Sequence, residues 1–339
     1  MAPDEAIVVG IGRYERFSPD GAGPNDLAGP VADAEAVADW LVNVAGARVN
    51  LITSEGTQTI TPAPPGRTAG AVWASPVQRP ADGDLRCAFR SFLAAGGGAG
   101  GYRVARRLYV YMAGHGFMPS PSSRCLVLAD ALGVTDVPNF TATAWIDWFA
   151  MQYYFDELVL WMDCCAIQTF DYEPMLPTMQ RVNPRGQGDM AKVFTAFAAR
   201  GARASYEGPI GPKGEVRGLF TYALLRGLRG AAATPTGEVT SESLRSYLLN
   251  GTLHPDIPSA DEMTFPAPQQ TLTYKVKSGP GLAEGTPVAI LDGQFKPVTA
   301  SQVQNGYVPI ALSKGLYQLV APGWQRIVSI EATTPLVLE

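Results

Sequence analysis

The stretch ELVLWMDCC, residues 157–165, is the most hydrophobic strand-like run of the chain. Its continuous apolar residues indicate a strand that is buried on both faces, as in a parallel sheet. The run ends abruptly in Asp163, Cys164 and Cys165. A strand that serves only the core needs no acid and no thiols at its end. We therefore expect this strand to carry a nucleophile to the rim of a sheet, where α/β proteins bind their ligands.

Strand-like and helix-like segments alternate around this run through the first two thirds of the 339-residue chain. Apolar runs predict strands, and apolar residues three or four apart predict amphipathic helices. The predicted strands span residues 6–12, 49–54, 106–116, 124–130, 157–165 and 191–200. The predicted helices span residues 26–46, 84–95, 141–152, 218–231 and 241–250, and residues 55–83 are predicted to form a long loop or an insertion. This order favours an α/β fold with a mostly parallel sheet that is covered on both faces.

The composition changes after residue 252. Residues 254–270 are polar and rich in proline, which is typical of a linker. Short strand-like segments at close spacing follow and predict a small β-sandwich, similar to immunoglobulin- or transthyretin-like modules. We therefore expect an α/β domain over residues 1–253, a linker over 254–270 and an accessory all-β domain over 271–339. No motif in the last part dictates chemistry, and binding of a protein partner is one role for it.

The composition excludes several classes of protein. A net charge of −5 and a pI of about 5.2 argue against binding to nucleic acid. No apolar run reaches the roughly 18 residues of a membrane span, and the acidic N-terminus is unlike a signal peptide. Four cysteines do not make a disulfide framework in a chain of this size, and adjacent Cys164 and Cys165 lack the spacing of a zinc site. We expect free thiols in a reducing cytoplasm, and neither a metal nor another cofactor.

His115 is one of only two histidines in the chain, and it lies between Gly114 and Gly116 at the end of a predicted strand. Glycine neighbours leave an imidazole open to close approach; a turn histidine without a chemical role is the alternative. Cys165 follows fifty residues later at the end of another strand, so neighbouring strands would bring both residues to one rim. An imidazole can take the proton of a thiol near neutral pH. The backbone N–H groups of Gly116 and Cys165 would then face a developing oxyanion.

At this point the chain resembles a known family. YVYMAGHGF (109–117) and LWMDCCA (160–166) are similar to the two signature strands of the caspase-like cysteine peptidases (clan CD, peptidase family C14), in the branch of the metacaspases and bacterial caspase-like proteins. VADAEAVADWL (31–41) resembles the family's first helix, and residues 193–248 resemble its carboxyl-terminal part. The resemblance covers roughly residues 5–250. It implies a caspase-like α/β/α sandwich and a cysteine endopeptidase that hydrolyses proteins or peptides.

The resemblance also assigns roles to single residues. The family's pattern places the nucleophile two residues after the acid, which selects Cys165. Cys164 then faces the other way, as a small buried side chain. Asp163 matches the acid that binds a basic P1 side chain in metacaspases, with Ser205 and Glu207 as further members of this S1 pocket. Because a carboxylate pairs well with a guanidinium, the resemblance implies cleavage after Arg or Lys.

The sequence departs from the family after the nucleophile. Ala166, Ile167 and Gln168 stand where metacaspases continue with His-Ser-Gly, which bears on substrate preference rather than on the pair. Some family members use calcium, but no loop of closely spaced acids resembles a calcium site.

Residues 176–190 are polar and lie between the nucleophile strand and the next strand. In this family that position is often cut into a large and a small subunit, so the resemblance implies processing after Arg181 or Arg185. An ordinary exposed loop is the alternative.

Three functions are compatible with these residues. The first is a cysteine endopeptidase that acts through Cys165 and His115. The second is a catalytically silent scaffold that binds protein partners. The third is a redox-active thiol protein that uses Cys164 and Cys165, although the pair lacks the CxxC spacing of such proteins.

Overall fold

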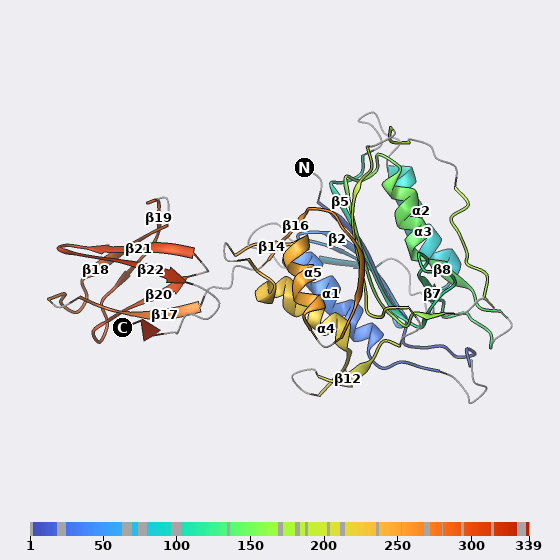
Figure 1. The fold of residues 1–339 in the computed structure, drawn as a ribbon, viewed down its shortest axis with the longest axis horizontal. Coiled ribbons are helices and arrows are strands. Elements are labelled where there is room, and N and C mark those ends of the chain that lie inside the picture. Colours follow the sequence, from blue (N-terminus) through green and yellow to red (C-terminus); the bar gives the residue numbers. More distant parts are fainter. Residues whose placement is uncertain are drawn as a thin grey trace.

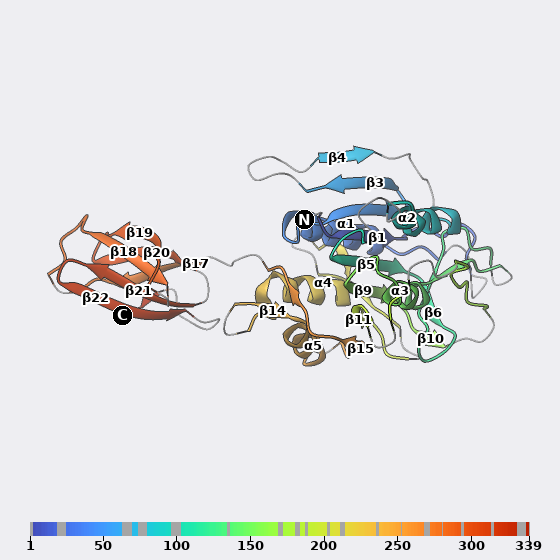
Figure 2. The same ribbon diagram turned by 90° about the horizontal axis from the view of Figure 1, so that it is seen from above.

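The computed structural model describes residues 3–18, 25–62, 70–73, 80–95, 103–133, 136–168, 172–179, 184–186, 189–201, 204–210, 214–234, 237–251, 253–267, 272–279, 281–292, 295–312, 315–330 and 337–338. A larger body combines a sheet with helices, and a smaller body consists of the C-terminal strands alone (Figures 1 and 2). No described helix is both long enough and apolar enough to cross a membrane.

An eight-stranded sheet runs through the larger body in the order β15-β11-β9-β5-β1-β2-β3-β4. Its central strands are parallel: β11 (Lys192–Phe197), β9 (Glu157–Cys164), β5 (Arg107–Gly114), β1 (Glu5–Gly10) and β2 (Arg48–Thr53). Antiparallel strands close both edges: β15 (Asp256–Ala260) on one side, β3 (Gly56–Thr61) and β4 (Gly70–Trp73) on the other. Every residue of β1 and β5 is buried, which explains why each strand carries no charged residue after its first, Glu5 or Arg107.

Helices cover both faces of this sheet (Figure 1). One layer holds α1 (Pro30–Asn43), α4 (Leu219–Arg226) and α5 (Ser241–Leu249), and a short π-helix, η1 (Gly227–Ala231), continues α4. The other layer holds α2 (Asp82–Ala95) and α3 (Ala142–Ala150). Because successive strand residues point to opposite faces, Val110 and Met112 of β5 pack with α2 and α3, whereas Tyr109 and Tyr111 pack with the other layer. The predicted α/β/α sandwich with a mostly parallel sheet is confirmed.

Smaller sheets surround the main one. The strands β6 (Gly116–Met118), β7 (Cys125–Val127), β8 (Asn139–Thr141) and β10 (Ile167–Gln168) form a sheet in the order β10-β6-β7-β8. Since β6 follows β5 and β10 follows β9 almost at once, this sheet stands at the carboxyl ends of the central strands. Two ribbons complete the body: β12 (Glu207–Pro209) with β13 (Val216–Gly218), and β14 (Val239–Thr240) with β16 (Thr264–Phe265).

Two predictions of irregular structure are wrong. Residues 55–83 do not form a loop throughout, because Gly56–Thr61 is rich in β-branched residues and pairs with β2 as the strand β3, followed by β4. Residues 254–270 are not only a linker, because β15 and β16 lie within them. The proline inside β15 is tolerated because an edge strand leaves some of its N–H groups unpaired. The α/β body therefore extends to Phe265, beyond the predicted boundary at residue 253.

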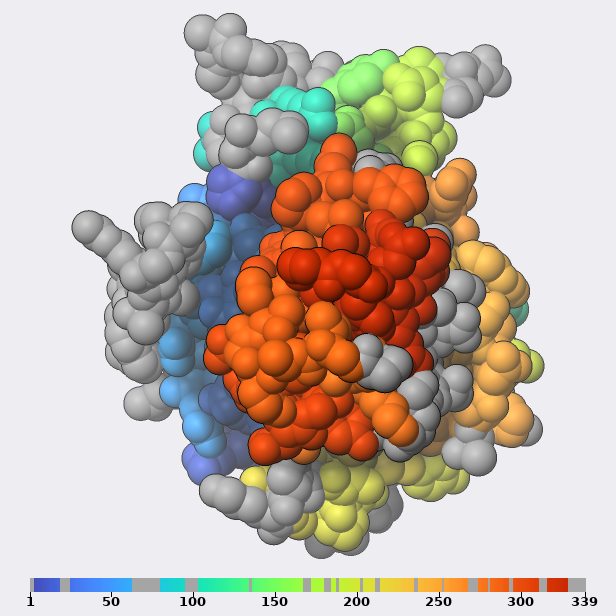
Figure 3. Space-filling model, turned by 90° about the vertical axis from the view of Figure 1, so that its left-hand side faces the viewer, coloured from blue at the N-terminus to red at the C-terminus, as the bar shows by residue number. Residues whose placement is uncertain are grey.

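The smaller body is a two-sheet β-sandwich, as the close spacing of its strands predicts. One sheet contains β20 (Tyr307–Leu312), β17 (Leu272–Lys277) and β23 (Val337–Leu338). The other contains β19 (Pro297–Gln302), β18 (Pro287–Asp292), β21 (Gly315–Ala321) and β22 (Trp324–Ile330). Val276, Ile290 and Leu319 lie in its core, which shares no residue with the cores of the larger body. Figure 3 views the molecule from the side of this sandwich.

Candidate active site

The register of two neighbouring strands brings His115 and Cys165 to the same rim of the sheet. β5 and β9 are parallel, and their last pair in register is Gly114 with Cys164. His115 and Cys165 are the next residue of each strand. Both side chains line one cavity of about 60 Å³. The sequence prediction that these residues close adjacent strands therefore agrees with the observed register.

The same cavity collects the three residues predicted for the S1 pocket. Asp163, Ser205 and Glu207 line it together with His115 and Cys165. They come from three segments: the end of β9, the irregular segment that leads into β12, and the first residue of β12. The cavity thus combines a thiol, an imidazole and carboxylates in one small space.

A hydrogen bond to a backbone carbonyl fixes the tautomer of His115. Its Nε2 lies 2.7 Å from the carbonyl oxygen of Asn25. A carbonyl can only accept, so Nε2 carries the hydrogen, and Nδ1 of the neutral ring keeps the lone pair of a base. Burial lowers the pKa of His115, although the Asn25 carbonyl and the charge of Asp26 act in the opposite direction. The imidazole is therefore neutral, and basic at Nδ1, near pH 7.

Two aromatic rings hold the imidazole in place. The rings of Tyr14 and Phe17 lie 4.7 Å and 5.4 Å from it, centroid to centroid. The backbone N–H of His115 also donates to the hydroxyl oxygen of Tyr14 at 2.9 Å. Gly114 makes room for that hydroxyl, because a Cβ there would lie 2.5 Å from it, and its φ of +152° is rare for other residues. Tyr14 is a positioning residue that the sequence patterns did not single out.

Gly116 is required by packing. A Cβ at this position would lie 2.6 Å from the Cβ of Cys164 and 3.0 Å from the carbonyl oxygen of Cys165. Its backbone therefore passes close to the backbone of Cys165.

The thiol of Cys165 is half-buried, and burial raises its pKa. The carboxylates of Asp163 and Glu207 raise the pKa further, whereas the backbone N–H of Ser205 lowers it by stabilising the thiolate. The resting side chain is consequently a thiol, which needs a base before it can attack. Cys164 differs: it is 6% exposed, and its thiol donates to the carbonyl oxygen of Met112 at 3.6 Å. This matches the expected role of a small buried side chain.

Asp163 is a buried carboxylate that has hydrogen-bond donors but no cationic partner among the described residues. Its Oδ1 accepts from Ser205 Oγ at 2.5 Å, and its Oδ2 accepts from Thr221 Oγ1 at 2.7 Å and Thr221 N at 3.1 Å. Burial raises its pKa in spite of these three donors. Among the residues that the structure describes, no lysine or arginine forms an ion pair with it. A basic group entering the cavity would meet a preorganised but uncompensated acid.

Asp33 is a site residue that the sequence reasoning missed. It lies in the first turn of α1, lines the same cavity and is 1% exposed. A Cβ on Gly218 would collide with the carboxylates of both Asp33 and Asp163, so the two acids flank one glycine. Burial raises the pKa of Asp33 to about 6, against the hydrogen bond from Gly218 N–H and the ion pair with Arg217. The signal was present in the sequence: Asp33 stands one turn before Val37, on the apolar stripe of the helix.

Glu207 is tied to the chain segment that precedes α1. Its carboxylate accepts from the backbone N–H groups of Gly29 at 3.1 Å and Ala28 at 3.2 Å. The side chain remains exposed to solvent, unlike those of Asp33 and Asp163. These bonds hold the entrance of the cavity against the N-terminus of α1.

The two predicted processing positions differ. Arg181 lies outside the described residues. Arg185 is anchored: its guanidinium donates to the carbonyl oxygens of Gln152 at 2.9 Å and Phe155 at 2.6 Å, and its side chain is 6% exposed. Cleavage after Arg185 would require its release from these contacts, so its side chain has a structural role as the protein stands.

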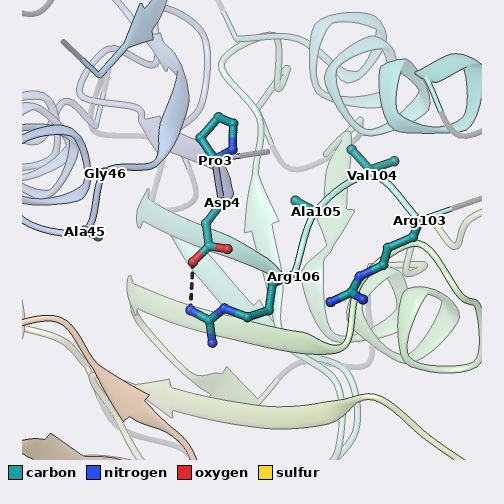
Figure 4. A pocket seen from close by; sticks show the side chains of 8 residues that line it. All are labelled: Pro3, Asp4, Ala45, Gly46, Arg103, Val104, Ala105 and Arg106. Atoms are coloured by element: carbon teal, nitrogen blue, oxygen red, sulfur yellow. Dashed lines mark hydrogen bonds and ion pairs between the residues drawn. The ribbon is translucent and has the colours of Figure 1, made fainter. Parts of the chain in front are cut away.

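A second cavity lies at the opposite rim, where the strands begin (Figure 4). It measures about 450 Å³, and Arg103 and Arg106 line it with Asp4. Arg106 pairs with Asp4 at 3.1 Å, the contact drawn in Figure 4, and with Glu157 at 2.6 Å. Arg103 pairs with Asp156. Each cation of this cavity therefore has an acid beside it.

Comparisons with known proteins find distant likenesses in structure only. No protein-family model matches the chain, and no curated protein is significantly similar to it in sequence. Protein GSU0716 of Geobacter sulfurreducens is similar with a TM-score of 0.46 at 12% identity, covering 79% of this chain and 94% of that one. Caspase-1 of Spodoptera frugiperda has a TM-score of 0.44 at 13% identity, covering 78% and 92%. The complex of the Porphyromonas gingivalis RgpB pro- and mature domains has a TM-score of 0.28 at 12% identity, covering 97% and 68%. At these values the likenesses do not decide what this chain does.

Proposed function

We propose that the protein is a cysteine endopeptidase that cleaves protein or peptide substrates after Arg or Lys. The observation that supports the proposal is one cavity that His115 and Cys165, the residues after the last register pair of β5 and β9, line together with Asp163, an acid that forms no ion pair with a described lysine or arginine. Nucleophile, base and substrate-binding groups within one small space are the minimum that peptide hydrolysis by a cysteine requires. The proposed chemistry needs no metal and no cofactor.

Acylation begins with the neutral pair. Nδ1 of His115 takes the proton of the Cys165 thiol as the sulfur bonds to the carbonyl carbon of the scissile peptide. The carbonyl oxygen gains a negative charge, which the backbone N–H groups of Gly116 and Cys165 stabilise. The carbon–nitrogen bond then breaks, and the protonated imidazole gives its proton to the departing amine.

Deacylation repeats these steps with water. His115 takes a proton from a water molecule while the oxygen attacks the thioester carbon. The carbon–sulfur bond breaks, the product leaves as a carboxylic acid, and the proton returns to the sulfur. A reducing compartment, which the cysteine usage predicts, keeps Cys165 available as a thiol.

The acids at the base of the cavity support a basic P1 residue. Asp163 and Asp33 are buried on either side of Gly218, and Glu207 stands at the entrance. A guanidinium or ammonium group between these carboxylates would offset the cost of burying their charge. An acidic P1 side chain would instead be repelled, which argues against the specificity of aspartate-directed caspases.

Turnover of fluorogenic peptides that end in Arg, Lys or Asp tests this function. We expect hydrolysis of the Arg and Lys peptides, loss of activity in Cys165→Ala, and little change in Cys164→Ala. A scaffold would hydrolyse none of them, and a redox protein would be sensitive to both substitutions. The burial of Cys164 already disfavours the redox alternative, because a buried thiol is poorly available for exchange.

Processing after Arg181 or Arg185 is part of the proposal. Intact masses of the purified wild type and of Cys165→Ala test it, because self-cleavage requires the nucleophile. Two fragments in the wild type and one intact chain in the variant are expected. Identical masses for both proteins would contradict self-processing without affecting the peptidase function.

A further inference from the structure

A larger cavity adjoins the one at Cys165. It measures about 410 Å³, and Ser205 lines both cavities. Its other walls come from the residues that follow β11, including Ala198 and Arg200, from Tyr206 and the start of α4, and from His254. The volume is sufficient for peptide side chains, and no step of the proposed reaction uses it.

This cavity is apolar at its base and cationic at its rim. Ala198 and Phe220 are buried, whereas Arg200 is exposed. The guanidinium of Arg200 donates from Nε to the carbonyl oxygen of Pro255 at 3.2 Å, which leaves its two terminal nitrogens for another partner. No acidic side chain that the structure describes forms an ion pair with Arg200. A guanidinium held by one nitrogen above a concave apolar surface is well placed to bind a carboxylate.

Two further residues mark the rim of this cavity as a binding surface. His254 has a φ of +49°, in the left-handed region that non-glycine residues adopt only at a cost in free energy. Its exposed imidazole supplies a second hydrogen-bond donor at the cavity of Arg200. Tyr206 is 68% exposed, and exposed aromatic side chains are typical of sites where another chain binds.

The order of the strands indicates which part of a substrate reaches this cavity. β9, which leads to Cys165, lies between β5, which leads to His115, and β11, which leads to Arg200. His115 gives its proton to the departing amine, so the residues after the scissile bond leave on the β5 side. The residues before the scissile bond must then extend on the other side of Cys165, towards the end of β11.

We propose that the larger cavity binds an acidic side chain of the substrate, at one of the positions P2 to P4, with Arg200 as its ion-pair partner. The inference rests on the proposed peptidase function and narrows its substrate class to sequences in which Asp or Glu precedes a basic P1 residue. An acidic cavity beside a cationic one selects a segment with the opposite order of charges.

Peptidyl-arginine coumarin amides test the proposal, because they contact only the side of the acyl group. One set carries a single Asp at P2, P3 or P4, and a matched set carries Asn there. We expect kcat/KM to be about fivefold higher for Asp at one of these positions, as a partly exposed charge pair provides. Arg200→Gln removes the difference, Arg200→Glu reverses it in favour of Asn at that position, and His254→Gln reduces it. Arg326→Gln, in β22 of the sandwich, is the matched control and leaves it unchanged.

Binding to Cys165→Ala separates this inference from the peptidase function. The same peptide sequences, labelled and uncleaved, are titrated by fluorescence anisotropy. If the Asp peptide binds more tightly than the Asn peptide and Arg200→Gln removes the difference, the cavity is supported as an acid-binding site. This holds even if the wild type shows no turnover, because a lack of turnover would refute only the peptidase function. Equal binding of the Asp and Asn peptides at all three positions, or a preference that survives Arg200→Gln, overturns the inference.

Discussion

The two rims of the central sheet are built from the same strands but differ in whether their charged side chains form ion pairs. At the amino ends, Arg106 lies between Asp4 and Glu157, and Arg48 pairs with Glu5 at 2.9 Å. At the carboxyl ends, Asp163 is buried with hydrogen-bond donors, and no described lysine or arginine pairs with it. Asp33 has Arg217 beside it at 2.5 Å. One rim balances its charges, and the other leaves an acid to be balanced.

We call the rim at the amino ends, where the ion pairs are complete, the structural rim, and the rim at the carboxyl ends, which carries Cys165 and His115, the chemical rim. Ion pairs that are complete within the chain can fasten strands, but they have no charge left over for a ligand. A buried carboxylate without a cation costs folding free energy, and a chain retains it where the charge acts on something that arrives later. The thiol of Cys165 and the imidazole of His115 lie at the carboxyl-end rim, where the buried Asp163 carboxylate costs folding free energy. Substitutions at the two rims should therefore have different consequences.

The largest expected effect comes from removing the base. His115→Ala should lower kcat/KM for an Arg-ended peptide by about a thousandfold or more, because the thiol of Cys165 then lacks a proton acceptor. Arg106→Ala, at the opposite rim, should change kcat/KM by no more than about twofold. Steady-state kinetics of both variants, with melting curves to show that both fold, checks the contrast. A loss of similar size in Arg106→Ala would remove the distinction between the rims.

The second effect concerns the uncompensated acid. Asp163→Asn keeps the size of the side chain and one acceptor oxygen but removes the charge, so kcat/KM for Arg-ended peptides should fall by about a hundredfold. Because burial raises the pKa of Asp163, the ionised group is a cost to folding at neutral pH, and the melting temperature should not decrease. Alkylation of Cys165 by iodoacetamide, which has no P1 side chain, is the control and should not become slower, because removing the neighbouring charge lowers the pKa of the Cys165 thiol. A slowed alkylation would place the role of Asp163 at the thiol instead.

Sequence patterns predicted that His115 and Cys165 lie at the same rim, because the residues that follow parallel strands lie at one end of the sheet regardless of the conformation of the loops. They did not predict Tyr14, whose part depends on the chain folding back against Gly114. Asp33 was marked in the sequence as an acid on the apolar stripe of a helix, but its place in the site became evident only once Asp163 was seen to flank the same glycine, Gly218. The edge strand β15 was taken for a linker because its proline and polar residues resemble a loop until a neighbouring strand is present to pair with them.

The third effect is a dependence on pH that comes from Asp33. Its pKa is raised to about 6, so the carboxylate gains its charge as the pH rises through that value. kcat/KM for Arg-ended peptides should therefore fall by about tenfold from pH 7 to pH 5, where about nine tenths of Asp33 would be protonated. Asp33→Asn should be slower at pH 7 and should lack this step. Burial lowers the pKa of His115, so its titration also contributes to the pH profile. The alkylation rate of Cys165 measures this contribution alone. An identical pH profile for alkylation and for peptide hydrolysis would assign the step to His115 instead of Asp33.

Asp33 should also leave a trace in stability. Its pKa is raised from an unfolded value of 3.8 to about 6, so the folded chain holds the proton more tightly between these values. The free energy of unfolding should then decrease as the pH rises from about 4 to about 6, by up to about 3 kcal/mol from this group. Denaturant unfolding at several pH values measures the slope, and Asp33→Asn should flatten it. A slope of the opposite sign that vanishes in Asp33→Asn would mean that the ion pair with Arg217 outweighs burial.

The smallest expected effect concerns Arg217, the cation that pairs with Asp33 at the chemical rim. It tests most directly whether an ion pair at this rim influences catalysis. Arg217 lowers the pKa of Asp33, so Arg217→Gln should raise it further and move the acidic limb of kcat/KM to higher pH. Arg-ended peptides should be hydrolysed about threefold more slowly at pH 6 and at an unchanged rate at pH 8, where the carboxylate is ionised in both proteins. Arg48→Gln, which breaks a comparable ion pair at the structural rim, is the matched control and should leave the profile in place. If Arg217→Gln instead accelerated hydrolysis at every pH, Arg217 would be competing with the basic side chain of the substrate for Asp33. The ion pair would then lower the activity of the wild type.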